Sequence, residues 1–263
     1  SAFNKFEILD GTMREDITFE EKRSIADRVP MWNKDYCIQC NQCAFVCPHA
    51  TIRPFLLTEE EIANGPEGLA ERVKPAMGPN VKEYKFIIQI SPHNCVGCGL
   101  CVKECMANKT AARLGNDHLA LKLVEAKSQF DDEKYANYLF KHVEYKSDKF
   151  STDTVKGVGY LMPYMEVSGA CAGCGETPYY RLLTQLFGQD MLVANATGCS
   201  SIYSGSTPLT PFVNDKCGNG VAWANSLFED NAEFGYGMRL ATDAKLAGIT
   251  AILLEALNKR SVE

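Results

Sequence analysis

The chain has 263 residues, a length that accommodates one large domain or two of ordinary size. It is 46% hydrophobic and 23% charged, as core-forming proteins usually are, and its net charge is −6. This acidic balance argues against a nucleic-acid partner and against an anionic membrane surface, because both attract surplus Lys and Arg. No apolar stretch is long enough to span a bilayer, and the first residues do not form a signal peptide.

Residues 1–34 are predicted to form a linker that contains one short helix. Residues 35–147 are predicted to form a first domain, which contains the internal repeat described below. Within it, Thr58 precedes three consecutive glutamates and predicts a capped helix start. Residues 85–90 are rich in apolar and aromatic side chains and predict a strand, whereas residues 117–147 are predicted to be helical.

The charge-rich stretch over residues 144–156 is the expected domain boundary, and residues 148–263 form the second predicted domain. In this part residues 180–187 predict a helix and residues 191–196 a buried strand. Residues 198–211 are rich in Gly, Ser and Thr and are predicted to form a loop of the kind found at active sites. A helical stripe of leucines and isoleucines follows near the end of the chain. Strands that alternate with loops and helices indicate an α/β architecture.

The internal repeat consists of two cysteine runs with the same spacing, C-x₂-C-x₂-C-x₃-C. A [4Fe–4S] cluster needs four thiolates, and a tightly turned C-x₂-C-x₂-C segment supplies three of them from one stretch of backbone. In two-cluster ferredoxins the fourth cysteine of each run ligates the other cluster. The predicted ligand sets are therefore Cys37, Cys40, Cys43 and Cys105 for one cluster, and Cys95, Cys98, Cys101 and Cys47 for the other.

Disulfide bonds and zinc are the competing interpretations of this cysteine density. Disulfide frameworks are typical of short secreted chains, whereas this chain is long and carries no export signal. Zinc takes four ligands, usually as two separated pairs, so that eight cysteines in two dense runs fit it poorly. The sequence therefore predicts iron–sulfur clusters that carry electrons in reducing, cytoplasmic surroundings.

A further pair, Cys171 and Cys174, lies in a Gly-rich loop, and Cys199 follows within Thr-Gly-Cys-Ser-Ser. Three cysteines can hold a third cluster that lacks one ligand. A redox-active C-x-x-C pair and a zinc knuckle remain equally open on the residues alone. Cys217 is the one other candidate for a fourth ligand, although its interpretation as a plain thiol is favoured.

Three stretches, residues 171–179, 196–201 and 222–233, closely resemble the pyruvate:ferredoxin (flavodoxin) oxidoreductase family. The order of parts is also similar, because in that family a two-cluster ferredoxin domain lies directly upstream of a thiamine-diphosphate domain. The resemblance covers nearly the whole chain. It implies an α+β ferredoxin-like domain with two [4Fe–4S] clusters, followed by the first part of an α/β thiamine-diphosphate-binding domain.

The resemblance also implies roles for particular residues. Cys171, Cys174 and Cys199 would ligate a third [4Fe–4S] cluster together with a cysteine from further downstream. Glu176 and the backbone of Cys199 would line the thiamine diphosphate pocket.

The implied reaction is the oxidative decarboxylation of pyruvate to acetyl-CoA and CO₂, with thiamine diphosphate as electron sink and coenzyme A as acetyl acceptor. Electrons would pass one at a time through the three clusters to ferredoxin or flavodoxin. The implied assembly is a homodimer.

The sequence lacks two features of this family, a Mg²⁺-binding motif and a downstream cysteine. Thiamine enzymes of this type hold the diphosphate through Mg²⁺ on a Gly-Asp-Gly motif, because Mg²⁺ prefers hard oxygen ligands. No Gly-Asp-Gly occurs here, and the downstream cysteine is absent as well. The chain is therefore expected to be an internal segment of a longer polypeptide, with the Mg²⁺ ligands elsewhere. The alternative function is a pure ferredoxin-type electron-transfer protein without catalysis of its own.

Overall fold

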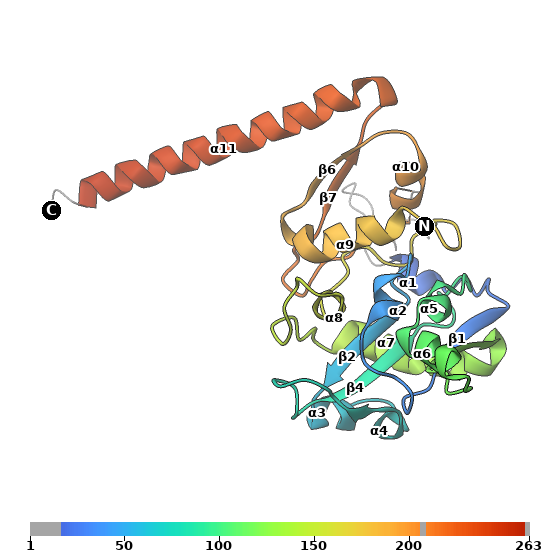
Figure 1. Ribbon diagram of the computed structural model, residues 1–263. Helices are drawn as coiled ribbons and strands as arrows, with labels where there is room; N and C mark the ends of the chain where they lie inside the picture. The colour runs from blue at the N-terminus through green and yellow to red at the C-terminus, as the bar shows by residue number, and fades with distance from the viewer. Residues whose placement is uncertain (1–16, 206–208, 261–263) are drawn as a thin grey trace, which may run out of the picture.

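The two cysteine runs each lie between two strands, and this repeat organises the N-terminal part of the computed structural model (Figure 1). The structure describes residues 17–205 and 209–260. Each unit consists of a strand, a cysteine run with one short helix, and a second strand. The first unit contains β1 (Arg28–Trp32), α2 (Gln42–Phe45) and β2 (Ile52–Leu57). The second unit contains β4 (Lys85–Ile90), α5 (Leu100–Lys103) and β5 (Leu121–Glu125).

The two units pair with each other, because each sheet takes one strand from each unit. β1 pairs antiparallel with β5, and β2 pairs antiparallel with β4 over their full lengths. The short β3 (Lys74–Pro75) pairs with the other edge of β4. The helices α2 and α5 of the two units are also in contact. This exchange brings two runs that are far apart in the sequence into one core.

The remaining elements of this part are helical. Thr58 and Glu61 form a capping box at the start of α3, which confirms the helix start predicted there. The predicted strand over residues 85–90 is confirmed as β4. The helical elements are α1 (Ile17–Glu21), α3 (Glu59–Ala63), α4 (Leu69–Arg72), α6 (Met106–Leu114), the 3₁₀ helix η3 (Ala126–Asp132) and α7 (Glu133–His142).

Residues 117–147 do not form the continuous helical region that was predicted. Leu121 and Leu123 belong to strand β5, and regular α-helix begins only at Glu133. Apolar residues at every second position are the pattern of a strand, so the sequence already carried the correct period. Within residues 1–34, the predicted linker, residues 28–32 form β1 and thus belong to a sheet.

The second part is built around a pair of parallel strands. β6 and β7 pair in register, and α9 precedes them in the chain. The helix predicted over residues 180–187 is confirmed, and so is the strand predicted over residues 191–196, but this strand is not buried as expected, because only Asn195 in it is buried. The loop predicted over residues 198–211 begins with a helix. The elements are α8 (Val155–Val158), α9 (Thr177–Phe187), the 3₁₀ helix η4 (Gly188–Asp190), β6 (Leu192–Asn195), α10 (Cys199–Ser204), β7 (Ala222–Asn225), the 3₁₀ helix η5 (Phe228–Asp230) and α11 (Asn231–Arg260).

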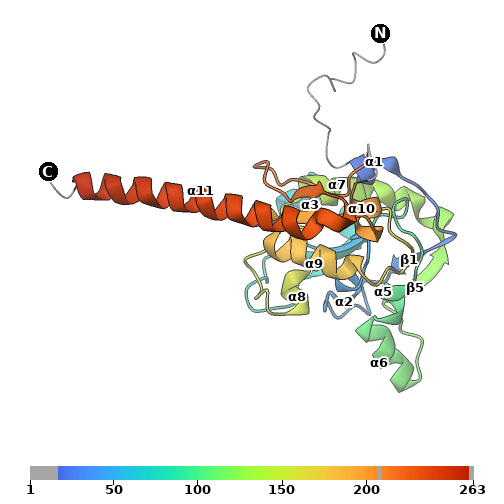
Figure 2. The ribbon, with the colours of Figure 1, turned by 90° about the horizontal axis from the view of Figure 1, so that it is seen from above.

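The helix α11 extends away from the rest of the molecule in both views (Figures 1 and 2), and it contains the helical stripe expected near the end of the chain. None of its residues is buried. In the part of the chain that the structure describes, no helix combines the length and the apolar composition that crossing a bilayer requires.

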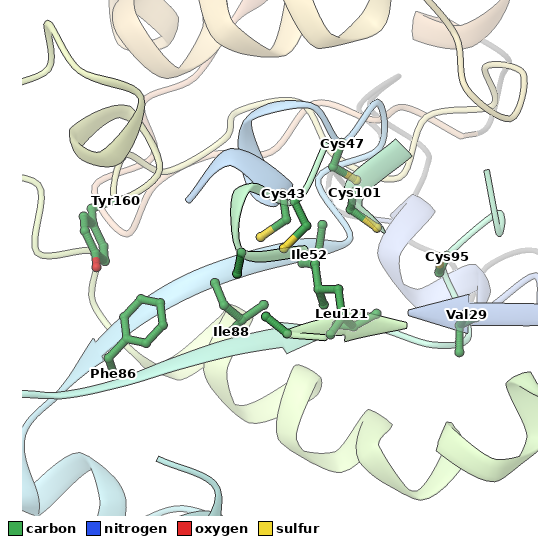
Figure 3. Close-up of a cluster of buried hydrophobic side chains, with 14 of the residues drawn as sticks. Val29, Cys43, Cys47, Ile52, Phe86, Ile88, Cys95, Cys101, Leu121 and Tyr160 are labelled. Carbon is green, nitrogen blue, oxygen red and sulfur yellow. The ribbon is translucent and has the colours of Figure 1, made fainter. Parts of the chain in front are cut away.

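The sheet formed by β2 and β4 separates two hydrophobic cores. On one face Ile52 and Ile88 pack with the buried cysteines of both runs (Figure 3). On the other face Phe55 and Ile87 pack against Leu139 of α7. Because successive side chains of a strand point to opposite faces, the near-continuous apolar sequences of β2 and β4 supply both cores.

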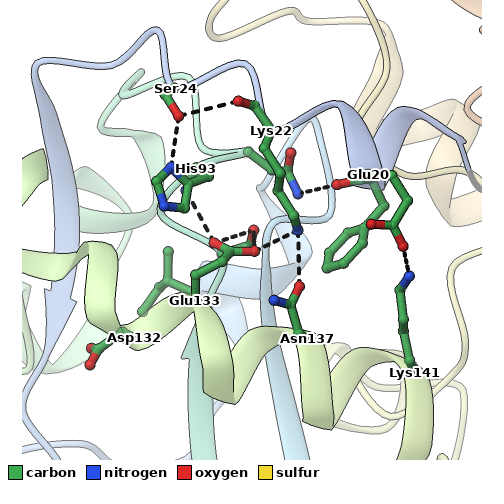
Figure 4. A network of polar contacts seen from close by, with 12 residues as sticks. Glu20, Lys22, Ser24, His93, Asp132, Glu133, Asn137 and Lys141 are labelled. Atoms are coloured by element: carbon green, nitrogen blue, oxygen red, sulfur yellow. Dashed lines mark hydrogen bonds and ion pairs between the residues drawn. The ribbon is translucent and has the colours of Figure 1, made fainter.

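The segment that enters the first unit is held against α7 by polar contacts around Glu133 (Figure 4). The Lys22 Nζ atom lies 2.6 Å from the Glu133 carboxylate, and the Ser91 hydroxyl donates to that carboxylate at 2.8 Å. The His93 backbone N–H donates to it at 3.2 Å, and the His93 ring lies 2.7 Å from the Ser24 hydroxyl. One buried carboxylate therefore joins the start of the described chain to the turn before Cys95.

We predict that Glu133→Ala lowers the free energy of unfolding by about 3 kcal/mol, because it leaves partly buried Lys22 without its ionic partner. Urea denaturation monitored by circular dichroism measures this change. Lys109→Ala breaks the exposed Lys109–Glu104 pair and serves as a control that should leave stability unchanged. A Glu133→Ala protein as stable as this control would contradict the assigned role.

Candidate functional site

The first cavity is lined by Cys37, Cys40, Cys43 and Cys105. Cys43 and Cys105 are buried, whereas Cys37 and Cys40 are partly exposed. The other residues that line this cavity are mainly apolar: Trp32, Ile38, Asn41, Ile88, Ala107, Ala120 and Leu121. The four cysteines are those of the first predicted ligand set, with the fourth supplied by the second run.

The second cavity is lined by Cys47, Cys95, Cys98 and Cys101. All but Cys98 are buried. This is the second predicted ligand set, with Cys47 supplied by the first run. The lining is completed by Pro30, Pro48, His49, Thr51, Ile52, Val96, Gly99 and Leu100.

One backbone feature is shared by the first C-x₂-C segment of each run and by the Cys171–Cys174 loop. The residue before the second cysteine has a positive φ in each: 56° at Gln39, 71° at Gly97 and 74° at Gly173. This left-handed conformation turns the chain sharply, so that two cysteines three positions apart face the same side. The Cys171–Cys174 loop therefore shares this first turn with the two ferredoxin-like runs, but not the second left-handed residue that follows in them at Asn41 and Gly99.

Backbone N–H groups also point at cysteine sulfurs, inside the first turn of the two runs and just after the Cys171–Cys174 turn in the third loop. The N–H of the second residue after the cysteine donates at 3.4 Å to the Sγ atoms of Cys37, Cys95 and Cys174. Such hydrogen bonds stabilise the negative charge of a cluster thiolate and influence its reduction potential. The cavities, with four thiols, mostly apolar walls and amide donors, fit a [4Fe–4S] cluster.

Gln39 occupies a left-handed position that glycine takes in the other runs, and its side chain explains why it is tolerated. Its amide donates to the Pro75 carbonyl at 2.8 Å and accepts from the Met77 N–H at 2.8 Å. At Gly97 a side chain is excluded, because a Cβ atom would lie 2.8 Å from the Arg28 carbonyl. Sequence reasoning missed Gln39, although its alignment with Gly97 in the repeat was a usable signal.

Burial raises the pKa of several cavity thiols. It raises that of Cys95 to about 12, and those of Cys43 and Cys101 also lie well above the ordinary value. These thiols are neutral without a metal, so that metal binding releases protons. At Cys174 burial also acts to raise the pKa, but hydrogen bonds from the Thr177 and Glu176 backbone outweigh it and lower the pKa.

The Cys171–Cys174 loop lies directly against the second cavity. A Cβ atom at Gly173 would lie 3.7 Å from the Cys98 Cβ atom. The buried His49, which lines the second cavity, has its Nε2 atom 3.3 Å from the Cys171 carbonyl oxygen. The third cysteine pair is therefore next to the cysteines that line the second cavity.

Cys199 is the first residue of α10 and is exposed, as is Cys171. Its helix is tied to the loop by the Tyr203 hydroxyl, which donates to the Glu176 carboxylate at 2.7 Å. Among the described residues, no three His, Cys, Asp or Glu side chains converge as a single-ion site requires. Cys217 lines a separate, larger cavity to which none of the other cysteines contributes.

Glu176 precedes α9 and is joined through Tyr203 to α10, the helix that follows the carboxyl end of β6. There the Asn195 amide donates to the Asn225 side-chain oxygen at 2.8 Å, and the Ser200 hydroxyl donates to Asn195 at 2.7 Å. Ligands of open α/β sheets bind outside the carboxyl ends of the strands. The predicted cofactor residues Glu176 and Cys199 thus lie beside a network of polar side chains in the position where such folds bind ligands.

A buried arginine in this region was not foreseen from the sequence. Arg181 of α9 is only 4% exposed and reaches into the first unit, where it contacts the backbone of Cys47. Burial lowers its pKa to about 10, which leaves the guanidinium charged at neutral pH. No local pattern marks this residue, because its contacts join segments more than 130 positions apart.

Residues 36–109 match the family of 4Fe-4S dicluster domains. The N-terminal part of the chain therefore contains an iron–sulfur dicluster domain, in agreement with the repeated cysteine spacing.

The whole chain is similar to larger proteins. It is 46% identical over 248 residues to the pyruvate:ferredoxin oxidoreductase of Moorella thermoacetica, a match that covers 94% of this chain and 20% of that protein. It is 50% identical over 244 residues to the pyruvate-flavodoxin oxidoreductase of Klebsiella pneumoniae, with 93% and 20% coverage. It is 41% identical over 252 residues to the mitochondrial pyruvate dehydrogenase [NADP(+)] of Euglena gracilis, with 95% and 13% coverage.

The chain thus corresponds to a segment of the pyruvate:ferredoxin and pyruvate-flavodoxin oxidoreductases, and the resemblance noted in its sequence is confirmed. It spans about a fifth of the length of these curated relatives. The assignment of individual cysteines as cluster ligands remains a prediction.

We predict that Cys105→Ala removes one cluster's iron and acid-labile sulfide from the anaerobically purified protein. Cys105→Ala combined with Cys37→Ala should lose no more, because both cysteines line the first cavity. Cys105→Ala combined with Cys95→Ala should lose a second cluster. Iron and sulfide analysis measures all three, and equal losses in the two double variants would contradict the exchanged ligand sets.

Proposed function

We propose that this chain is the electron-transfer segment of a pyruvate oxidoreductase and that it carries three [4Fe–4S] sites. The observation that carries the proposal is the Cys171–Cys174 loop, which shares the first turn of the two ferredoxin-like runs and packs against the second cavity. An electron carrier fused to an unrelated domain would have no need of that arrangement.

The order of the three sites follows from these contacts. The Cys171–Cys174 loop touches Cys98 of the second cavity, and the two cavities are joined through α2 and α5. The first cavity therefore lies at the outer end of the series. When bound, each cluster accepts and donates single electrons. The chain's own contribution is to hold the three cysteine sets in sequence, with largely apolar walls around two of them.

The outer end of the series is the proposed exit for electrons. Tyr36 and Ile38, beside Cys37, are 39% and 50% exposed, so that the first cavity is near the surface. The names of the relatives supply ferredoxin or flavodoxin as the proposed acceptor. The NADP(+) named for the Euglena relative indicates that this exit can serve different acceptors.

The second part is proposed to supply part of a thiamine diphosphate site. Its support is that the Cys199 backbone begins α10 shortly after the carboxyl end of β6, and that Glu176 contacts this helix through Tyr203. When bound, thiamine diphosphate is the electron sink for decarboxylation of pyruvate. Glu176 would hydrogen-bond the cofactor, held in place by Tyr203. The Mg²⁺ ligands are proposed to lie outside this segment, because the sequence contains no Gly-Asp-Gly.

The remaining assignments follow from the same proposal. Residues 35–147 would be the ferredoxin-like domain and residues 148–263 the first part of the thiamine-diphosphate domain. Cys171, Cys174 and Cys199, with one further cysteine, would hold the third cluster. The complete protein would be a cytoplasmic homodimer that converts pyruvate and coenzyme A to acetyl-CoA and CO₂.

We predict that pyruvate reduces the clusters of the full-length protein. Addition of pyruvate, with thiamine diphosphate and coenzyme A present, should bleach the visible absorbance of the iron–sulfur clusters under anaerobic conditions. Dithionite, which reduces clusters directly, is the control. If dithionite bleaches the absorbance and pyruvate does not, the chain belongs to a pure electron carrier, and the proposed enzyme function is wrong.

We predict that Glu176→Gln weakens thiamine diphosphate binding about tenfold or more, because the charged hydrogen-bond acceptor is lost. Tyr203→Phe removes only the hydrogen bond that holds the Glu176 side chain, so it should weaken thiamine diphosphate binding less. Fluorescence titration of the cofactor-free full-length protein measures both affinities. Unchanged affinity in Glu176→Gln would remove this residue from the cofactor site.

A further inference from the structure

Arg181 is a buried cation whose described hydrogen-bond partners are all uncharged. Its guanidinium donates to the Cys47 carbonyl at 3.2 Å, to the Phe45 carbonyl at 2.5 Å and to the Gln185 side-chain oxygen at 2.5 Å. All three acceptors are uncharged. Within residues 17–205 and 209–260, no Asp or Glu side chain forms an ion pair with it.

Arg53, the other buried arginine among the described residues, has a different environment. Arg53 forms an ion pair with the buried carboxylate of Glu166 and donates to the Tyr145 hydroxyl at 2.8 Å. Burial of a charge is costly unless an opposite charge compensates it. Among the described residues Arg53 has a carboxylate partner and Arg181 has none. The positive charge of Arg181 is therefore not compensated by an acidic side chain.

The second cavity is close enough to Arg181 to hold a compensating negative charge. Cys47, whose carbonyl binds the guanidinium, also lines the cavity together with Cys95, Cys98 and Cys101. Four thiolates outweigh the positive charge of the cluster that they hold, so the loaded site is an anion. It gains a further negative charge when it is reduced.

We propose that Arg181 is the counter-charge of the cluster in the second cavity and raises the reduction potential of that cluster. The inference rests on the proposed function, since it requires a cluster in this cavity. A positive charge in a medium of low dielectric constant favours the reduced, more negative state. Arg181 is thus a positioning residue of the electron path: it makes the middle site easier to reduce.

Contacts within the second part of the chain hold the Arg181 guanidinium in place. Gln185, one helical turn after Arg181, donates to the carbonyls of Val158 at 3.2 Å and Leu161 at 2.9 Å. The same helix, α9, begins directly after the loop with Cys174. The helix α9 therefore places the Arg181 charge beside the second cavity. Because the same helix begins directly after the Cys171–Cys174 loop, it also connects the second cavity to the third cysteine pair.

The test is a redox titration of the intact, anaerobically purified protein monitored by electron paramagnetic resonance. The signal that disappears in Cys47→Ala identifies the cluster of the second cavity. Arg181→Gln should shift the reduction equilibrium of this cluster at least tenfold toward the oxidised state, which is about 59 mV lower for a one-electron couple. Arg181→Lys keeps the positive charge, so the reduction potential of its cluster should stay close to that of the parent protein.

A purely structural role predicts a different result. Loss of packing admits water, which stabilises the reduced anion and raises the potential instead of lowering it. Arg239→Gln removes an arginine charge from the exposed helix α11 and is the charge-matched control. Gln185→Glu retains Arg181 and adds a carboxylate beside it, so it should lower the potential even if Arg181→Gln fails to retain the cluster.

The outcomes separate this inference from the proposed function. A higher or unchanged potential in Arg181→Gln overturns the inference, and so does loss of the cluster in Arg181→Lys. If Arg181→Gln loses the cluster, an unchanged potential in Gln185→Glu overturns it as well. Absence of iron and sulfide from the parent protein would instead overturn the proposed function itself.

Discussion

A cysteine run can direct its thiols at one cluster only if the backbone turns back between its first two cysteines. This constraint is met by a left-handed residue before the second cysteine, at Gln39, Gly97 and Gly173. In the two runs this turn also aims an N–H group at the sulfur of the first cysteine, whereas in the third loop the N–H of Glu176 donates to the sulfur of Cys174. Strand exchange between the two units then delivers the fourth cysteine of each run to the other cavity.

Much of this arrangement was predictable because its causes are local or repeated. The cysteine spacing specifies three ligands from one turn, and the repeat of the run predicts that the fourth ligands are exchanged. Capping residues and apolar periodicity located the helices at Thr58 and over residues 180–187. These features need only a few neighbouring residues to be recognised.

The features that were missed depend on distant contacts. Strand β5 was expected to be helical although its leucines alternate as in a strand, and its pairing with β1 shows that the alternating period applies. The side chain of Gln39 stabilises a turn through contacts with Pro75 and Met77, almost 40 positions away. Arg181 looks like an ordinary helix residue, and only the tertiary structure shows that it reaches Cys47.

The contacts between the two parts of the chain connect electron transfer to the proposed chemistry. His49, Gly173 and Arg181 all lie where the second part meets the second cavity. A separate ferredoxin would have to find this interface by diffusion, whereas here one polypeptide holds it in place. In the proposed function, the fusion would support rapid movement of single electrons away from the site where they are released.

The central claim is that the two cysteine-lined cavities hold [4Fe–4S] clusters and not zinc or disulfides. Quantification of iron, acid-labile sulfide and zinc in the anaerobically purified protein tests it most directly. The account predicts iron and sulfide in equal amounts, enough for at least two clusters per chain, and no stoichiometric zinc. Zinc without sulfide, or metal-free protein with its cysteines paired in disulfides, would contradict it.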